Sequence, residues 1–112
     1  MYLKSIFQVF KKVKRLRLVV YNEQNKQGET IIENVNDSNI QSTINTIDWS
    51  IFHIVQLEDR NGYVVYVCGC LEEDGFAYGY LKNGRHILSQ NPPNSLIEVT
   101  QIFINYLDNH KS

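Results

Sequence analysis

Apolar residues recur at spacings of three and four positions near both ends of the chain, which is the period of a helix with one buried face. The first stripe predicts a helix over 2–13 and consists of Leu3, Ile6, Phe7, Phe10 and Val13. The second predicts a helix that ends near 108 and consists of Leu96, Val99, Phe103, Tyr106 and Leu107. Ser95 and Glu98, at the start of this stripe, have the spacing of a capping box, which supports the helix start.

A shorter helical stripe lies in the middle of the chain. Ile40, Ile44 and Ile47 predict a helix that ends near residue 48. Ser38 and Gln41 have the spacing of a capping box and are expected to start it. Asn, Ser and Thr are poor helix formers, so packing has to hold this helix in place.

Six further segments are rich in β-branched and aromatic residues and predict strands. They are 15–21, 29–35, 51–58, 63–70, 76–81 and 85–89. The first two are expected to pair as a hairpin, and the Asn-Gly pairs at 61–62 and 83–84 favour tight turns. The stretch 63–67 is apolar at successive positions and predicts a central strand covered on both faces, whereas 85–89 predicts a short edge strand. Gly69 is expected at a bulge or a close backbone approach.

The order of these elements predicts an α+β fold. We expect an antiparallel sheet of about five to six strands with a meander core, an N-terminal helix, a short middle helix and a C-terminal helix. The strands cluster instead of alternating with helices, which argues against a doubly wound sheet. A length of 112 residues predicts a single domain over 1–112.

Charge is distributed unevenly along the chain, although the net charge is only −1. Residues 1–17 carry six Lys and Arg and no acid, whereas the rest carries five against twelve acids. A basic segment of this kind either binds nucleic acid or a membrane surface, or is the solvated face of a helix. We favour the second interpretation, because no stacking platform or nucleic-acid motif accompanies the basic run.

Side chains that could carry catalysis are scattered. The three histidines, His53, His86 and His110, show no metal-ligand spacing. Cys68 and Cys70 are too close along a strand for a relaxed disulfide, and two thiolates do not complete a zinc site. A nucleophile pair of either cysteine with His53 lacks a third, orienting group. We therefore predict no catalytic centre, cofactor or metal, and a chain that is not an enzyme.

The two cysteines are expected to be reduced and buried, which indicates a reducing compartment. No segment reaches the roughly eighteen apolar residues of a membrane span. The first residues also lack the pattern of a secretory signal. These features together predict a cytoplasmic protein.

Five acidic residues are candidates for binding a basic partner. Glu58 and Asp59 end one strand, and Glu72, Glu73 and Asp74 open the loop after the next strand. Turn carboxylates are usually solvated, but they can also give electrostatic complementarity and fast association. In an antiparallel meander the two groups lie at opposite ends of strand 63–70.

Tyr78 and Tyr80 complete the candidate partner-binding set. With Phe76, they share one face of strand 76–81. Half-buried packing is the favoured interpretation of this row. The alternative is an exposed aromatic patch of the kind that interfaces use.

Several segments taken together resemble the small immunity proteins of bacterial polymorphic toxin systems, specifically the large family usually named first among them. They are Ile32-Glu33-Asn34, Ile47-Asp48, Val55 to Asp59, Val65 to Gly69, the Gly-Tyr strand, Ser95 to Val99 and Phe103 to Leu107. The resemblance covers about residues 16–108. Members often carry Ile-Glu-Asn-Pro before the first helix, where this chain has Val35 in place of the proline.

The resemblance implies inhibition by contact. Such a protein binds a cognate toxin domain, often one that attacks nucleic acid, and blocks its active site or its substrate path. The family supplies no catalytic residues, so only the role is carried over. The expected partner is a cognate toxin protein. That this partner is basic is our inference from the acidic loops of this chain and does not come from the family.

Overall fold

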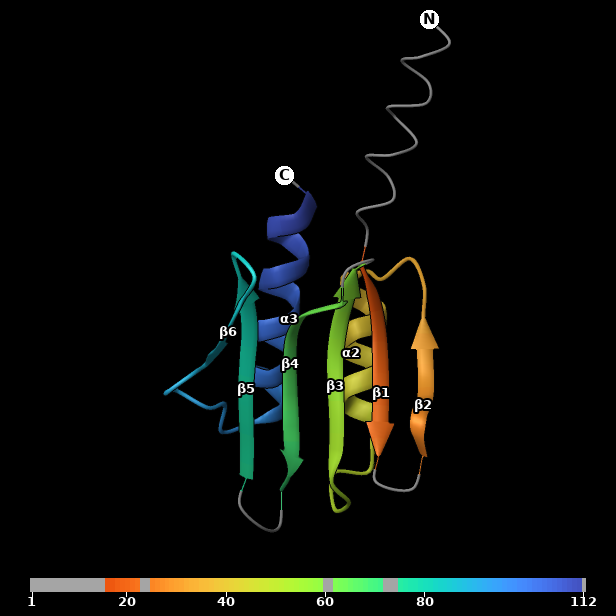
Figure 1. Ribbon diagram of the computed structural model, residues 1–112. Coiled ribbons are helices and arrows are strands. Elements are labelled where there is room, and N and C mark those ends of the chain that lie inside the picture. The colour runs from red at the N-terminus through yellow and green to blue at the C-terminus, as the bar shows by residue number, and fades with distance from the viewer. Residues whose placement is uncertain (1–15, 23–24, 60–61, 72–74, 112) are drawn as a thin grey trace, which may run out of the picture.

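The computed structural model describes residues 16–22, 25–59, 62–71 and 75–111 (Figure 1). Six strands form one antiparallel sheet in the order β2-β1-β3-β4-β5-β6. The strands are β1 (Arg17–Asn22), β2 (Asn25–Ile32), β3 (His53–Asp59), β4 (Gly62–Cys70), β5 (Gly75–Lys82) and β6 (Arg85–Leu88). Two helices follow the hairpin and the meander, and they are α2 (Asp37–Thr46) and α3 (Leu96–Lys111). The α+β class and the antiparallel sheet are confirmed, whereas the helix predicted over 2–13 lies outside the described residues.

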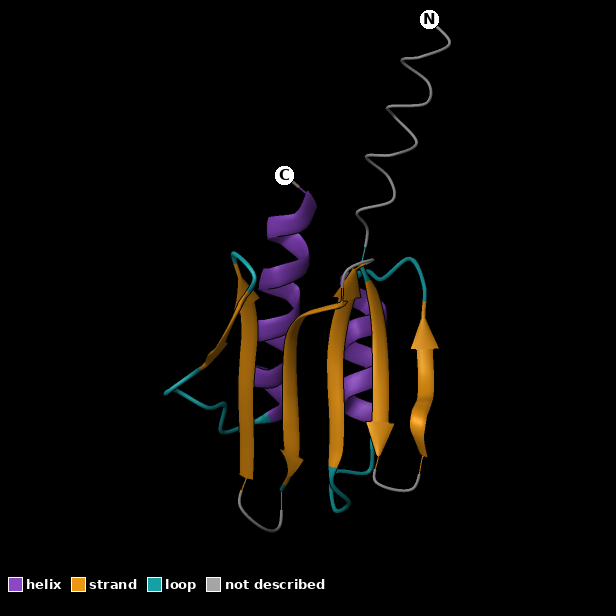
Figure 2. Ribbon diagram, in the orientation of Figure 1, coloured by secondary structure: helices purple, strands orange, loops and turns teal. Residues whose placement is uncertain are grey.

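Both helices lie on one face of the sheet, which makes a two-layer arrangement (Figure 2). In Figure 1, α2 runs behind β1 and β3, and α3 runs behind β4 and β5. The core lies between the layers, where alternate strand residues meet the helix stripes. Its fully buried members include Leu18, Val55, Leu57, Val65, Val67, Ile40, Ile44, Val99 and Phe103. Burying each such side chain contributes roughly 1.5–3 kcal/mol to folding.

The starts of the two helices differ in how well the sequence indicates them. The Glu98 backbone N–H donates to the Ser95 hydroxyl at 3.2 Å, so the start predicted for α3 is confirmed. The start predicted for α2 at Ser38 and Gln41 is wrong. Asn36 is the N-cap: its side chain accepts from the Asn39 backbone N–H at 2.8 Å, and the Asn39 side chain accepts from the Asn36 N–H at 2.9 Å. Asparagine caps a helix as well as serine does, so the helix can start two residues earlier at no cost.

β4 lies inside the sheet, as expected, but only one of its faces is covered by described helices. Val65 and Val67 are fully buried towards the helices, whereas Tyr66 and Cys68, which alternate with them, are half-buried on the other face. The expectation of cover on both faces is therefore wrong. The close backbone approach expected at Gly69 is confirmed, since an added Cβ there would lie 2.1 Å from the Gly75 carbonyl oxygen.

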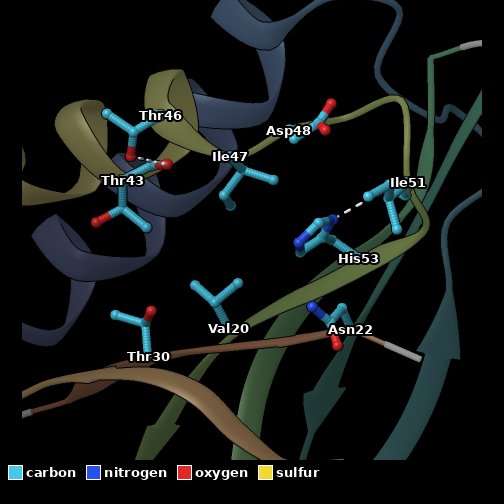
Figure 3. Close-up of a pocket in the computed structure, with 9 residues that line it drawn as sticks. All are labelled: Val20, Asn22, Thr30, Thr43, Thr46, Ile47, Asp48, Ile51 and His53. Carbon is cyan, nitrogen blue, oxygen red and sulfur yellow. Dashed lines mark hydrogen bonds between the residues drawn. The ribbon is translucent and has the colours of Figure 1, made fainter. Parts of the chain in front are cut away.

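A cavity of about 330 Å³ lies where the C-terminal end of α2 faces β1, β2 and β3 (Figure 3). The chain beyond α2 turns back towards the sheet through Trp49, whose indole N–H donates to the Ile44 carbonyl at 2.9 Å. The same ring packs edge-on against Phe76, with ring centroids 5.1 Å apart. Ile47, Asp48 and Ile51 of this turn line one side of the cavity.

Candidate interaction surface

The sheet face opposite α2 and α3, the helix-free face, is covered by no helix of the described chain. Val19 points to this face because Leu18 and Val20, on either side of it, pack in the core. Strand pairing then defines a row across all six strands, here called the central row. Its members are Ile31, Val19, Gln56, Tyr66, Gly79 and Leu88. The two ends of the row are apolar and open to solvent, with Ile31 50% and Leu88 61% exposed.

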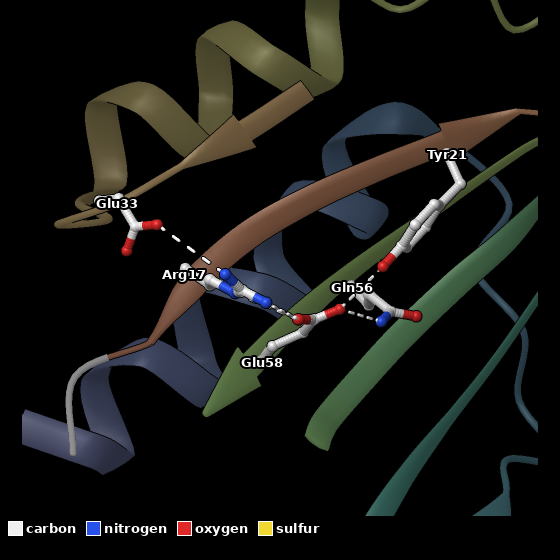
Figure 4. Close-up of polar contacts among 5 residues, drawn as sticks. All are labelled: Arg17, Tyr21, Glu33, Gln56 and Glu58. Carbon is white, nitrogen blue, oxygen red and sulfur yellow. Dashed lines mark hydrogen bonds and ion pairs between the residues drawn. The ribbon is translucent and has the colours of Figure 1, made fainter. Parts of the chain in front are cut away.

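A polar network that includes Gln56 of the central row lies on the helix-free face (Figure 4). Glu58 is its centre and is only 8% exposed. Arg17 donates to one carboxylate oxygen of Glu58 from Nε at 3.2 Å and from Nη2 at 3.0 Å. The Tyr21 hydroxyl donates to the other oxygen at 3.1 Å, and the Gln56 amide donates to that oxygen as well. Arg17 also lies 3.9 Å from Glu33, which completes the network.

Burial and the neighbouring Glu58 carboxylate shift the pKa of the Tyr21 hydroxyl. Burial raises the pKa of the Tyr21 hydroxyl, and the charge and hydrogen bond of Glu58 raise this pKa further. Tyr21 therefore stays a neutral donor to the carboxylate at physiological pH. A buried carboxylate needs such partners, since an unpaired one would carry a large desolvation cost.

The structure describes two of the five acidic candidates, Glu58 and Asp59. Glu58 is a buried member of the network, so its interpretation as an open turn carboxylate is wrong. Asp59 is half-buried at the end of β3. Glu72, Glu73 and Asp74 lie outside the described residues. The strand ends that flank the two acidic groups do lie at opposite ends of β4, as the pairs Asp59–Gly62 and Cys70–Gly75 show.

Tyr63, Tyr66 and His86 form an aromatic cluster on the helix-free face. The Tyr63 and Tyr66 rings meet edge to face with centroids 5.4 Å apart. Tyr66 and His86 stack with centroids 5.7 Å apart, and the Tyr66 hydroxyl is 3.1 Å from His86 Nε2. Gly79 makes room for this stack, because an added Cβ there would lie 2.9 Å from the Tyr66 ring.

Tyr78 and Tyr80 lie on the other side of β5. Both are half-buried and pack against the core. The Tyr80 ring contacts Tyr106 of α3 with centroids 5.8 Å apart. Packing, the favoured interpretation of this pair, is confirmed, whereas its assigned role in partner binding stays a prediction.

The aromatic cluster has no signature in the sequence, for a physical reason. Tyr63 and Tyr66 are three residues apart, so regular alternation would place them on opposite faces. The pairing of β3 with β4 shifts between Leu57 and Glu58, which leaves Val64 as an extra residue in β4. This bulge brings both tyrosines to one face. Arg17 and Tyr21 are recognisable as alternating positions of one strand, but the pattern does not reveal their shared acceptor.

His53 and Cys68, one of the two pairs considered for catalysis, lie on opposite faces of the sheet. His53 is buried at 4% exposure, and its Nδ1 donates to the Ile51 carbonyl at 2.9 Å. Its strand partner is Gly69, whereas Cys68 pairs with Ile54 on the helix-free face. Burial raises the pKa of the Cys68 thiol, which disfavours the reactive thiolate. Within the described ranges, no three His, Cys, Asp or Glu side chains are placed to share a metal ion.

Comparison of the chain with protein-family models, with curated proteins and with solved structures finds no match. Neither α2 nor α3 combines the length and the apolar character that a membrane-spanning helix needs. The resemblance to immunity proteins therefore stays a prediction from the sequence. The geometry of the helix-free face is the structural evidence that bears on function.

Proposed function

We propose that this protein is an immunity protein, which binds a cognate basic toxin domain and blocks its active site or substrate path. The observation that carries the proposal is the helix-free face, with its central row running from Ile31 to Leu88. A broad sheet face that presents exposed aliphatic ends, tyrosines and fixed polar groups has the composition of a protein interface. The sequence resemblance supports the same role.

Charge supports a basic partner. Beyond residue 17 the chain carries twelve acids and five Lys and Arg. Glu33 lies on the rim of the polar network, and its side chain is 68% exposed. Rim carboxylates of this kind attract a basic surface and speed association. The Glu58 carboxylate is already hydrogen-bonded within the network. The network therefore presents fixed polar groups to a partner, and no unpaired charge from Glu58.

The test is co-expression with the product of the adjacent gene. We expect the two proteins to purify as a complex, and we expect this chain to restore growth when the neighbour is toxic. Failure to form a complex and failure to restore growth would together overturn the proposal.

The surface is tested with a matched pair of exposed aliphatic residues. Leu88→Lys adds a positive charge to the helix-free face, where we expect it to weaken binding of the basic partner by about tenfold or more. Ile97→Lys makes the same change on α3, where Ile97 is 82% exposed, and should leave binding unchanged. Equal effects of both variants would show that the helix-free face is not the interface.

A further inference from the structure

The cavity beside α2 is separate from the helix-free face, because it lies on the helix side of the sheet (Figure 3). Its volume of about 330 Å³ falls within the range of small-ligand sites. Val20, Ile47 and Ile51 give it apolar walls. A group with a short alkyl part and a polar head would therefore fit both its size and its lining.

Besides hydroxyls and a carboxylate, the polar lining includes the Asn22 amide and the His53 ring, so it offers donors as well as acceptors. Thr30, Thr43 and Thr46 supply hydroxyls, and Asp48 supplies a carboxylate. Among the described residues, no Lys or Arg lines the cavity. The charge of His53, which also lines the cavity, is one of the causes that lower the pKa of the Asp48 carboxyl, so a protonated His53 partly offsets the negative charge at the site.

The end of α2 adds to this negative character. α2 ends at Thr46, and its last turn has no basic residue. The last carbonyls of a helix carry a partial negative charge of about half an electron, which favours a cation nearby. The cavity lies at this end of the helix, so the helix dipole and the Asp48 carboxylate act in the same direction.

Asp48 is held in its ionised form and in one orientation. Hydrogen bonds from the Ser50 hydroxyl and backbone N–H lower the pKa of the Asp48 carboxyl. Both bonds end on Oδ1. Neither of these bonds uses Oδ2.

We propose that this cavity binds an organic cation, namely a guanidinium group carried on a short alkyl chain. The guanidinium head donates to the Asp48 carboxylate and the threonine hydroxyls, and the alkyl part packs against Val20 and Ile47. A guanidinium is preferred to an ammonium because its planar fork of donors reaches several acceptors at once and is more weakly hydrated. The group can come from a free arginine-like molecule or from an arginine of a protein partner.

The test is a titration of the isotope-labelled full chain with Nα-acetyl-arginine amide, followed by NMR. We expect saturable shifts at the backbone amides of Thr43, Thr46 and Asp48, with a dissociation constant of about 1 mM. The citrulline analogue has the same shape without the charge and should bind at least about fivefold more weakly, in line with the strength of charge-assisted hydrogen bonds. No saturable shift, or equal shifts with both compounds, would overturn the proposal.

Variants locate the site. Asp48→Asn removes the charge and should weaken binding about fivefold or more, and Thr46→Val should weaken it less. Asp108→Asn makes the same change near the end of α3, away from the cavity, and should leave binding unaltered. Unchanged binding in both Asp48→Asn and Thr46→Val would assign the ligand to another place.

A last experiment distinguishes the two sources of the cation, a free arginine-like molecule and an arginine of a protein partner. If the free compound binds and Asp48→Asn also weakens the complex with the neighbouring gene product, the site accepts a partner's arginine. If only binding of the free compound is lost, the site serves a small molecule. Binding of the free compound is measured without the partner protein, so this inference and the proposed function can fail separately.

Discussion

At the scale of single residues, neighbours in space decide what a charged side chain does. Glu58 stands at the end of a strand, where the sequence predicts a solvated carboxylate. The fold instead places Arg17, Tyr21 and Gln56 around it and leaves it 8% exposed. Its role is to hold the helix-free face together, because three side chains from two strands donate to its two oxygens.

We predict that Glu58→Ala lowers the free energy of unfolding by about 2 kcal/mol, measured by urea denaturation. The variant leaves the Arg17 charge and the Tyr21 hydroxyl without their acceptor. The figure stays below that of a fully buried pair because the Arg17 side chain is 46% exposed and solvent screens it.

Glu33→Ala is the matched control, since Glu33 also faces Arg17 but its side chain is 68% exposed. This variant should change the free energy of unfolding by less than about 0.5 kcal/mol. Equal losses in the two variants would show that burial of Glu58 contributes nothing to its importance.

At the scale of helices and strands, the cap of α2 gives a direct comparison of sequence and structure. We predict that Asn36→Ala destabilises the protein by about 1 kcal/mol, because it removes the acceptor for the Asn39 backbone N–H. Ser38→Ala, two residues later, should be close to neutral. Thermal or urea unfolding of both variants measures the difference, and a larger loss for Ser38→Ala would reinstate the cap predicted from the sequence.

The apolar periodicity of the sequence predicts which helices and strands exist better than it predicts how they pair and pack. The stripes of α2 and α3 and all six strands are recognisable in the sequence, because each element must turn apolar residues towards one core. Two features depend on pairing and packing between elements and are not recognisable. The bulge at Val64 sets the face of Tyr63, and the placement of both helices on one side leaves Tyr66 half open.

The candidate site is predictable only in part, for the same reason. Asp59 is where the pattern places it, at a strand end, but Glu58 is enclosed by residues that include Arg17 of β1. The separation of 41 positions between Arg17 and Glu58 along the chain gives no local signal. The cavity beside α2 likewise joins residues from separate strands and a helix end, so no short motif marks it.

At the scale of the whole molecule, stability should fall in alkaline solution. Burial raises the pKa of Tyr21, Tyr66 and Tyr106, and that of Tyr106 reaches about 12 against an ordinary value of 10.0. The unfolded chain then loses its phenolic protons at lower pH than the folded protein does. The stabilisation is fully present below pH 10 and is lost as the pH rises towards about 12.

The measurement is the urea midpoint as a function of pH, with tyrosinate absorbance recorded in parallel. We expect a steady fall of the midpoint above pH 10 for the native chain and a shallower fall for Tyr106→Phe. An identical slope in the variant would contradict the assignment to Tyr106. This test concerns the contact between α3 and the sheet, since Tyr106 lies against Tyr80.

The strand order has a consequence for how the molecule is joined together. Four of the five strand pairs link consecutive strands, so the β1–β2 hairpin and the β3–β6 meander each consist of local contacts. Only β1 against β3 spans the intervening helix, and closing that longer loop costs more chain entropy than closing a hairpin. The sheet thus consists of two parts, the β1–β2 hairpin and the β3–β6 meander, which meet at one seam, the pairing of β1 with β3. The ion pair of Arg17 and Glu58 lies across this seam and fastens one part to the other.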